Sequence, residues 1–194
     1  SSITEIDSLT YLGLNNNNLT GAIPEGIGSI DSLRYIFLYN NQLGCYDYDY
    51  ECDPMGMKNE CCIIHCDDTE ECSGKIPPEI GNLVNLTKVF IGINNLSGEI
   101  PESICELDID WNSPSYFWIN GNQFCPYYPS CIADYVGEQD ISECSEIVTD
   151  IDGNYYGIVQ IGDQIWMAEN LKVTHYNDGS EISTGYSNEE WTEL

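Results

Sequence analysis

Hydrophobic and polar positions recur with a fixed spacing over residues 1–144. The segment LTYLGLNNNNLTGAIPEGIGSIDS begins at Leu9, and a matching segment begins at Leu33, 24 residues later. A third copy begins at Leu86, and a degenerate fourth copy, PSYFWINGNQFCPYYPSCI, begins at Pro114. The common pattern is LxxLxLxxNxLxGxIPxxIGxLxx. A repeat of this length indicates a stack of similar structural units rather than one irregular domain.

The pattern within each repeat predicts three kinds of local structure. Each LxL segment is expected to form a short strand with two inward apolar side chains. These pairs are Leu12 and Leu14, Ile36 and Leu38, Val89 and Ile91, and Phe117 and Ile119. A recurring asparagine is expected to bury its amide and satisfy backbone groups at the turn, at Asn17, Asn41, Asn94 and Asn122. The Ile-Pro-x-x-Ile-Gly segments then form the opposite wall, where proline suits extended or 3-10 backbone.

These motifs resemble the leucine-rich repeats of plant receptors and of some bacterial surface proteins. The resemblance covers residues 1–144, with several positions recurring in phase. It implies a solenoid of short parallel strands with a 3-10 or irregular convex side and a C-terminal cap. Upstream of Leu9, Ile3 and Ile6 occupy the IGxL places of a copy whose beginning is missing. We therefore expect natural sequence to precede Ser1.

One repeat is interrupted between Gly44 and Cys72. Removing these residues restores the 24-residue period, so the segment is an acidic, cystine-rich insertion in the second repeat. Its six cysteines are expected to close three bridges among themselves, with Cys45 and Cys72 joining the neck; the other pairings stay open. These cysteines are Cys45, Cys52, Cys61, Cys62, Cys66 and Cys72. A zinc site at CCIIHC is the less favoured alternative.

The insertion has three possible roles. It is either a tolerated decoration, a recognition knob beside the binding face, or a weak calcium site. The alternating YDYDYECD places Asp47, Asp49, Glu51 and Asp53 on one side of an extended strand, but no glycine-centred calcium loop follows.

The remaining four cysteines predict a sealed end of the solenoid. Cys105 and Cys131 fall next to equivalent isoleucines of neighbouring repeats, so we expect them to be bonded. Cys125 and Cys144 are then expected to form the second bridge of the cap. A cap protects the apolar cross-section at the end of a repeat stack.

The residues that flank the inward LxL positions are expected to face outward on the concave side. Read across the repeats they form columns that are rich in aromatic residues. The candidate ligand-binding residues are Tyr11, Tyr35, Phe37, Tyr39, Lys88, Phe90, Tyr116 and Trp118. Contiguous exposed apolar patches usually mark binding sites, so this face predicts binding of a glycan or a protein. The alternative is that a neighbouring domain, a missing segment or another subunit covers it.

Residues 145–194 follow a different pattern. Tyr155–Ile161 and Gln164–Met167 are expected to pair as a hairpin through Gly162-Asp163, and a second turn is expected at Asn177-Asp178-Gly179. The words DIDGNYY, IGDQIWMAENL and YNDG resemble the opening of the Fibrobacter succinogenes major paralogous domain. That resemblance implies a small, mainly β domain, cut within its length, on a secreted or surface protein of bacteria. Asp150 and Asp152 are further weak calcium candidates.

Composition narrows the class of function. The chain has 5 basic and 33 acidic residues, a formal charge of −28, which disfavours binding to nucleic acid or anionic lipid. Ten cysteines in 194 residues indicate an oxidising, extracellular compartment. His65 and His175 have no nucleophile motif near them, so we expect no enzyme and no cofactor apart from the weak calcium candidates.

The sequence therefore predicts an extracellular recognition or adhesion protein of a bacterial cell surface. Its partner would be a protein or polysaccharide bound on the aromatic concave face, and no membrane span is seen in this segment. The alternative is a structural subunit that self-associates into an extracellular filament or surface layer.

Overall fold

The computed structural model describes residues 6, 8–52, 61–144, 147–168 and 170–183. The chain divides into two compact units, Ser1–Cys144 and Ser145–Leu194. The division falls where the repeat pattern ends. In the described ranges, no helix has the length and apolar character that crossing a membrane requires.

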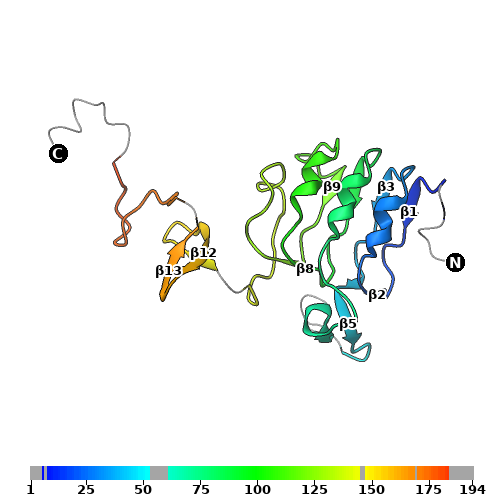
Figure 1. Ribbon diagram of the computed structural model, residues 1–194, viewed down its shortest axis with the longest axis horizontal. Coiled ribbons are helices and arrows are strands. Elements are labelled where there is room, and N and C mark those ends of the chain that lie inside the picture. Colours follow the sequence, from blue (N-terminus) through cyan, green and yellow to red (C-terminus); the bar gives the residue numbers. More distant parts are fainter. Residues whose placement is uncertain (1–5, 7, 53–60, 145–146, 169, 184–194) are drawn as a thin grey trace. The chain divides into compact units, whose positions relative to one another are not determined.

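The first unit without its insertion (residues 44–72) is here called the coil stack. It consists of successive turns of chain whose strands pair in parallel in the order β1-β3-β7-β9 (Figure 1). The strands are β1 (Tyr11–Gly13), β3 (Tyr35–Phe37), β7 (Lys88–Phe90) and β9 (Phe117–Trp118). Equivalent repeat positions face one another, as Leu12, Ile36 and Val89 show. The short parallel strands expected from the LxL segments are present.

Other short elements complete each coil. Two further parallel pairs join β2 (Thr20–Gly21) to β4 (Gln42–Leu43) and β8 (Ser97–Gly98) to β10 (Gln123–Phe124). The Ile-Pro segments lead into 3-10 helices, as predicted: η2 (Glu25–Ser29), η5 (Pro78–Asn82) and η6 (Glu102–Glu106). Pro24, Pro77 and Pro101 precede these helices with φ of −70°, −66° and −68° and ψ of 137°, 136° and 139°, which is extended backbone.

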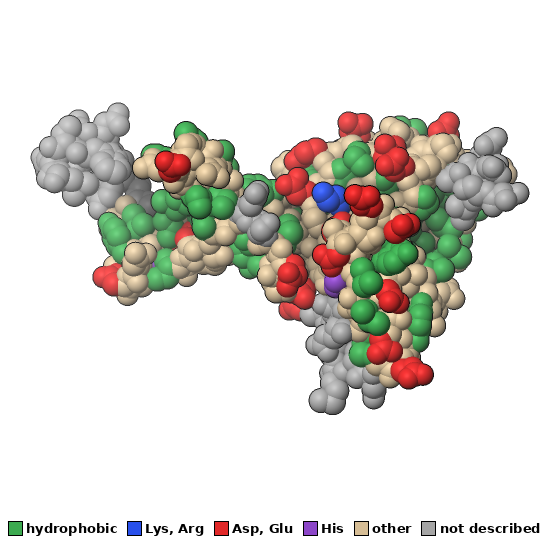
Figure 2. Space-filling model, turned by 60° about the horizontal axis from the view of Figure 1, so that its bottom comes forward, with side chains coloured by type: hydrophobic (Ala, Val, Ile, Leu, Met, Phe, Trp, Pro, Cys, Tyr) green, Lys and Arg blue, Asp and Glu red, His purple; other side chains and the backbone are tan. Residues whose placement is uncertain are grey.

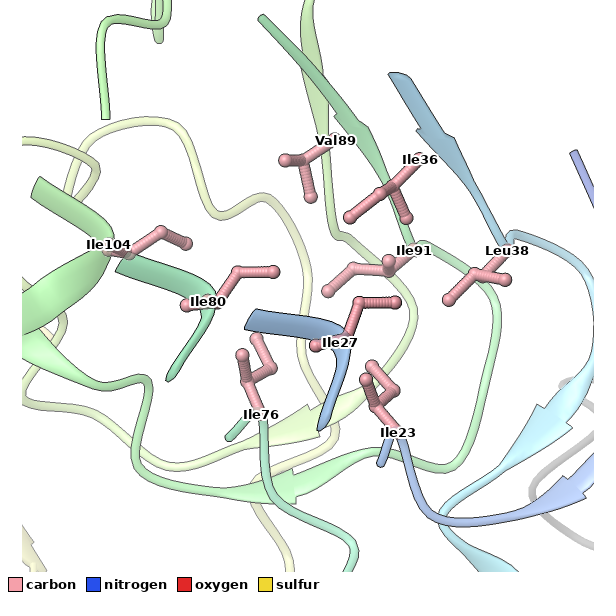
Figure 3. Close-up of a pocket in the computed structure, with 9 residues that line it drawn as sticks. All are labelled: Ile23, Ile27, Ile36, Leu38, Ile76, Ile80, Val89, Ile91 and Ile104. Atoms are coloured by element: carbon pink, nitrogen blue, oxygen red, sulfur yellow. The ribbon is translucent and has the colours of Figure 1, made fainter. Parts of the chain in front are cut away.

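Aliphatic side chains from the strands and from the Ile-Pro wall meet in one continuous core. Figure 3 shows nine of them, including Ile36 and Val89 from the sheet and Ile27, Ile80 and Ile104 from the 3-10 helices. The space they enclose is about 10 Å³. That volume is at the lower limit for a single water molecule, so it is a packing gap and not a ligand cavity.

Asparagines connect the coils through the core. The Asn94 amide donates to Leu38 O at 3.1 Å and to Ile91 O at 3.0 Å, while its oxygen accepts from Leu43 N at 3.0 Å. Asn41 and Asn122 make the equivalent bonds one coil before and one coil after. Each buried amide therefore satisfies backbone groups of two coils, which confirms the predicted ladder for these three residues.

The prediction is wrong at the first coil. Asn17 is exposed and bonds only within its own coil, to Leu14 O at 2.9 Å and Asn15 O at 3.1 Å. Leu14, expected to point inward, is 38% exposed. The physical reason is that both residues lie in the outermost described coil, where no described strand packs beyond β1.

The insertion forms a small antiparallel hairpin of β5 (Cys45–Tyr48) and β6 (Cys62–His65), followed by η4 (Cys66–Asp68). Its bridges are Cys45–Cys62, Cys52–Cys61 and Cys66–Cys72. The six cysteines do pair among themselves, but the expected Cys45–Cys72 bridge at the neck is wrong.

Backbone pairing closes the neck of the insertion in place of that bridge. Cys66 N donates to Gly44 O at 2.8 Å, so residues 67–72 already lie outside the hairpin. The returning chain is then held by Asp67, which accepts from Gly74 N at 3.1 Å and from the Ser97 hydroxyl.

The C-terminal end of the coil stack carries both predicted cap bridges, Cys105–Cys131 and Cys125–Cys144. The structure also shows that Gln139 extends the asparagine ladder beyond Asn122. Its amide nitrogen donates to Ile119 O at 3.2 Å and Val136 O at 2.8 Å. Glutamine thus replaces asparagine where the last coil departs from the repeat pattern.

The second unit contains a three-stranded antiparallel sheet of β11 (Ile147–Thr149), β12 (Tyr155–Ile161) and β13 (Gln164–Met167). The predicted hairpin is confirmed, with Gly162 at φ 63° in its two-residue turn. The second predicted turn is also present, since Gly179 N donates to Tyr176 O at 2.8 Å. Tyr156 is the one large hydrophobic side chain that is buried among the described residues of this unit.

Candidate binding surface

The aromatic face is the outward side of the sheet β1-β3-β7-β9. Its residues alternate along each strand with core residues such as Leu12 and Ile36, so they cannot point into the core. Six of the eight residues expected from the sequence lie in the paired strands: Tyr11, Tyr35, Phe37, Lys88, Phe90 and Trp118. Strand register brings these six together in neighbouring coils. The other two, Tyr39 and Tyr116, lie beside the strands and contact Trp118 and Lys88.

The rings of the aromatic face pack on one another from coil to coil. Phe37 and Phe90 are stacked, with centroids 4.9 Å apart and planes 25° apart. Tyr11 lies 5.3 Å from Phe37, and Tyr39 meets Trp118 edge-on at 5.5 Å. Aromatic pairs in stacked or edge-on arrangements add about 0.5–1.5 kcal/mol per pair beyond the burial of their area. Part of the aromatic face therefore stabilises the contact between neighbouring coils. Stacked rings expose mainly their edges to solvent.

This packing changes how much of the face is open. Tyr11 is 55% exposed and Tyr116 39% exposed, whereas the other five aromatic residues are half-buried. The sequence columns suggested seven solvated rings, but stacking between neighbours was not visible in the pattern. The aromatic face is thus an apolar surface on which the rings of Tyr11 and Tyr116 are exposed and the other five rings are partly covered.

Two glycines let rings lie close to the sheet. A Cβ on Gly13 would clash with Cε1 of Tyr11, and a Cβ on Gly92 would lie 3.1 Å from Cδ2 of Trp118 and 2.9 Å from Asn120 O. Side chains at these positions would push the two rings outward. The glycines are visible in the sequence columns, but their role depends on the ring orientations.

The charge of the aromatic face differs from that of the rest of the molecule. None of the 33 acidic residues occurs in 8–20, 32–43, 82–98 or 113–131, the segments that contain its strands. Figure 2 shows carboxylates spread over the surface seen in that view. Lys88, by contrast, places its ammonium 4.7 Å from the centre of the Tyr116 ring. The absence of acidic residues from these segments can be seen in the sequence, but only when the charges of all four repeats are compared.

The calcium candidates lie in two places. Asp47 and Asp49 are exposed on the insertion, where Asp49 accepts from Glu51 N at 2.9 Å, and Asp53 lies outside the described residues. Within the described part of the chain, no three His, Cys, Asp or Glu residues gather as metal ligands. A calcium site at these residues stays a prediction.

Asp150 and Asp152 hold the C-terminal unit together. Asp150 accepts from Asn154 N at 2.9 Å and from the Tyr156 hydroxyl at 2.5 Å. Burial raises the pKa of Asp150, but these hydrogen bonds outweigh it and leave the pKa below its ordinary value. Asp152 accepts from the backbone N–H of Thr174, which lowers its pKa to about 2. Both carboxylates thus have internal donors.

His175 belongs to a hydrogen-bond network with Asp152 and Thr174. His175 Nδ1 lies 2.5 Å from Asp152 Oδ1 and 3.1 Å from Thr174 Oγ1. Both contacts use the same ring nitrogen, and the Thr174 hydroxyl lies 2.8 Å from Asp152 Oδ2. A relay needs the hydroxyl and the carboxylate on opposite nitrogens, so this cluster is a structural hydrogen-bond network.

Comparison with known proteins gives one family match: residues 8–30 match the family described as Leucine Rich Repeat. No curated relative matches the chain. Among solved structures, it is similar to the leucine-rich-repeat ectodomain of the Arabidopsis thaliana receptor kinase GASSHO1/SCHENGEN3 (24% identity, 61% of this chain and 10% of that chain, TM-score 0.41).

Two further similar structures are the BIR3–SERK2 complex from Arabidopsis thaliana (22% identity, 69% and 56% of the chains, TM-score 0.47) and PEPR1–AtPEP1 (27% identity, 60% and 12%, TM-score 0.41). The chain spans between 10% and 56% of the length of these proteins. The five disulfides fit a secreted or extracellular protein. The family match thus identifies a leucine-rich repeat at residues 8–30.

Proposed function

We propose that this chain is an extracellular recognition or adhesion protein that binds its partner through the aromatic face. The observation that carries the proposal is the contrast between this face and the rest of the molecule. A chain with a formal charge of −28 keeps its acidic residues out of every strand segment of the face and places rings there instead. Tryptophan and tyrosine are enriched among the few residues that supply most of the binding energy in protein interfaces.

The partner is a protein or a glycan, and the ring geometry favours a protein. Stacking uses the faces of Phe37 and Phe90 and presents their edges, which carry the positive end of the ring quadrupole. Ring edges suit the faces of aromatic side chains and carbonyl oxygens of a partner protein. The bacterial cell-surface location rests on the resemblance of residues 147–194 to a domain of such proteins.

A second copy of this chain is the alternative partner, which would make it a subunit of a filament or surface layer. One observation favours it: two strongly acidic copies can approach through the aromatic face without opposing carboxylates. Repulsion between the remaining surfaces works against it.

The experiment is a comparison of the oxidised chain with a Phe37→Ser, Phe90→Ser variant. Sedimentation over a wide concentration range, with and without calcium, measures self-association. Pull-down of solubilised surface proteins and Trp118 fluorescence during polysaccharide titration measure binding to other partners. Val84→Ser is the matched control, because Val84 is an apolar side chain 69% exposed outside the face.

The outcomes separate the alternatives. Capture of a protein by the parent chain and the Val84 variant, but not by the double variant, supports the proposal. A fluorescence response to polysaccharide with the same variant pattern identifies a glycan instead. Concentration-dependent growth lost only in the double variant makes the chain a structural subunit. Binding that the double variant retains contradicts a role for the aromatic face.

A further inference from the structure

A groove crosses the coil stack along the Ile-Pro segments, away from the aromatic face. Its volume is about 570 Å³, within the range of ligand sites. Pro77 and Pro101 line it together with the edges of Ile23, Ile76 and Ile100, which are otherwise buried. We call it the flank groove. Its floor is apolar and is formed by successive extended segments that share one backbone conformation.

The walls of the flank groove are predominantly acidic. Glu25, Glu99 and Glu102 line it and are exposed, and no ion pair involves them within the described residues. The lining contains one cation, Lys75, whose aliphatic stem lies beside Gly98 of the next coil. Three carboxylates against one ammonium leave the groove negative, so charge complementarity selects a cationic occupant.

Tyr127 contributes a positioned ring to the same groove. It is 42% exposed, and its φ of 91° is unusual for a residue with a side chain. Such a backbone conformation is unfavourable and persists where the surroundings enforce it. Here the segment is fixed by the disulfides of Cys125 and Cys131.

The repeat alignment places Tyr127 at the position that Glu99 occupies one coil earlier. An aromatic ring beside a carboxylate is a suitable environment for a lysine or arginine side chain. The groove therefore offers an apolar floor for uncharged residues and a negative, partly aromatic wall for cationic ones.

We propose that the flank groove binds an extended cationic segment of a partner protein, in which lysine or arginine alternates with proline or aliphatic residues. The uncharged residues contact the Ile-Pro floor, and the cationic side chains contact Glu99, Glu102 and Tyr127. This site is separate from the aromatic face, and each can fail without the other.

The test uses a fluorescent peptide of alternating lysine and proline, with binding to the full-length oxidised chain followed by anisotropy at fixed salt. Glu99→Gln, Glu102→Gln is the groove variant. Asp134→Asn, Glu138→Gln is the control, because it removes the same charge from exposed positions outside the groove lining. A glutamate-proline peptide tests whether charge sign matters.

The expected result is about five- to tenfold weaker binding for the groove variant, as for two partly exposed ion pairs, and a change within about twofold for the control. Tyr127→Ala is expected to weaken binding and Lys75→Gln to strengthen it. Equal loss in the groove and control variants would show attraction by net charge alone and would overturn the proposal, as would no binding by the parent chain. Phe37→Ser, Phe90→Ser is expected to leave peptide binding unchanged, which keeps this test independent of the aromatic face.

Discussion

The coil stack and the C-terminal unit belong to one chain but use different interactions to hold their strands together. In the coil stack, aliphatic side chains from Leu12 to Val136 form one buried cluster, and asparagine amides bridge neighbouring coils. In the C-terminal unit, Ile165 is 68% exposed and Trp166 54% exposed, although both lie in a regular hairpin. There the carboxylates of Asp150 and Asp152 connect turns to strands.

The difference follows from the number of layers. Each coil presents an apolar strand and an apolar Ile-Pro wall that face each other, so stacking buries both. The described C-terminal sheet has apolar side chains on both faces and no second layer among the described residues to bury them. Hydrogen bonds to carboxylates are weaker than burial of a core and depend on pH. We therefore expect the two units to respond differently to mutation and to acid.

The largest expected effect is removal of a cap disulfide from the coil stack. Cys105→Ser, Cys131→Ser opens a bridge with a sequence separation of 26. The loop-entropy estimate is a loss of about 3–4 kcal/mol in the free energy of unfolding. Guanidinium unfolding followed by circular dichroism measures it. Cys66→Ser, Cys72→Ser serves as the control, because its loop has a separation of 6 and lies in the insertion. Equal losses from the two pairs would mean that the cap contributes nothing specific.

Next in size is the asparagine ladder. Asn94→Ala leaves the buried Leu43 N–H without its acceptor and opens a small cavity, so we expect a loss of about 2–3 kcal/mol. Asn17→Ala is the matched control from the same repeat position, exposed and bonded only within its coil, with an expected loss below about 1 kcal/mol. Thermal unfolding measures the loss of stability in each of the two variants. Similar losses would contradict a stabilising role for bridges between coils.

The third prediction concerns acid and the C-terminal unit. Asp152 has a folded-state pKa of about 2, below the 3.8 of an unperturbed aspartate. Its contribution to stability is therefore fully present above pH 3.8 and is lost as the pH falls through 2. Amide NMR signals of Thr174 and His175, which contact Asp152, are expected to broaden or shift over that interval. Asp152→Asn should remove most of this dependence; an unchanged profile in the variant would exclude Asp152 as its origin.

Much of this architecture was predictable because equivalent positions of successive repeats have the same structural role. Neighbouring residues in the sequence are enough to predict the buried asparagines, the inward apolar pairs and the Gly162-Asp163 turn. The first coil shows the limit, since Leu14 and Asn17 match the pattern and yet are exposed. A pattern predicts which side of a coil a residue occupies, but burial also requires a neighbouring coil.

Features that depend on three-dimensional register were not predictable. The Cys45–Cys62 bridge follows from how the insertion hairpin pairs, and Cys spacing allows many other connections. The stacking of Phe37 on Phe90 depends on side-chain rotation, which residue columns do not contain. Gln139 was missed because it takes the place of an asparagine outside the repeat period. The residues of the aromatic face were thus predictable, but the exposed fraction of each ring was not.

The smallest expected effect tests the comparison most directly. Ile165→Thr changes an apolar residue that is 68% exposed in β13, and threonine suits a strand, so the free energy of unfolding should change by less than about 0.5 kcal/mol. Ile104→Thr makes the same chemical change at a side chain with 0% exposure, where a cavity and an unpaired hydroxyl cost about 2–4 kcal/mol. Hydrogen exchange of the surrounding amides measures each variant in its own unit. A large loss of protection around β13 would show that Ile165 is covered in solution, and the contrast between a packed coil stack and an open sheet would then have to be abandoned.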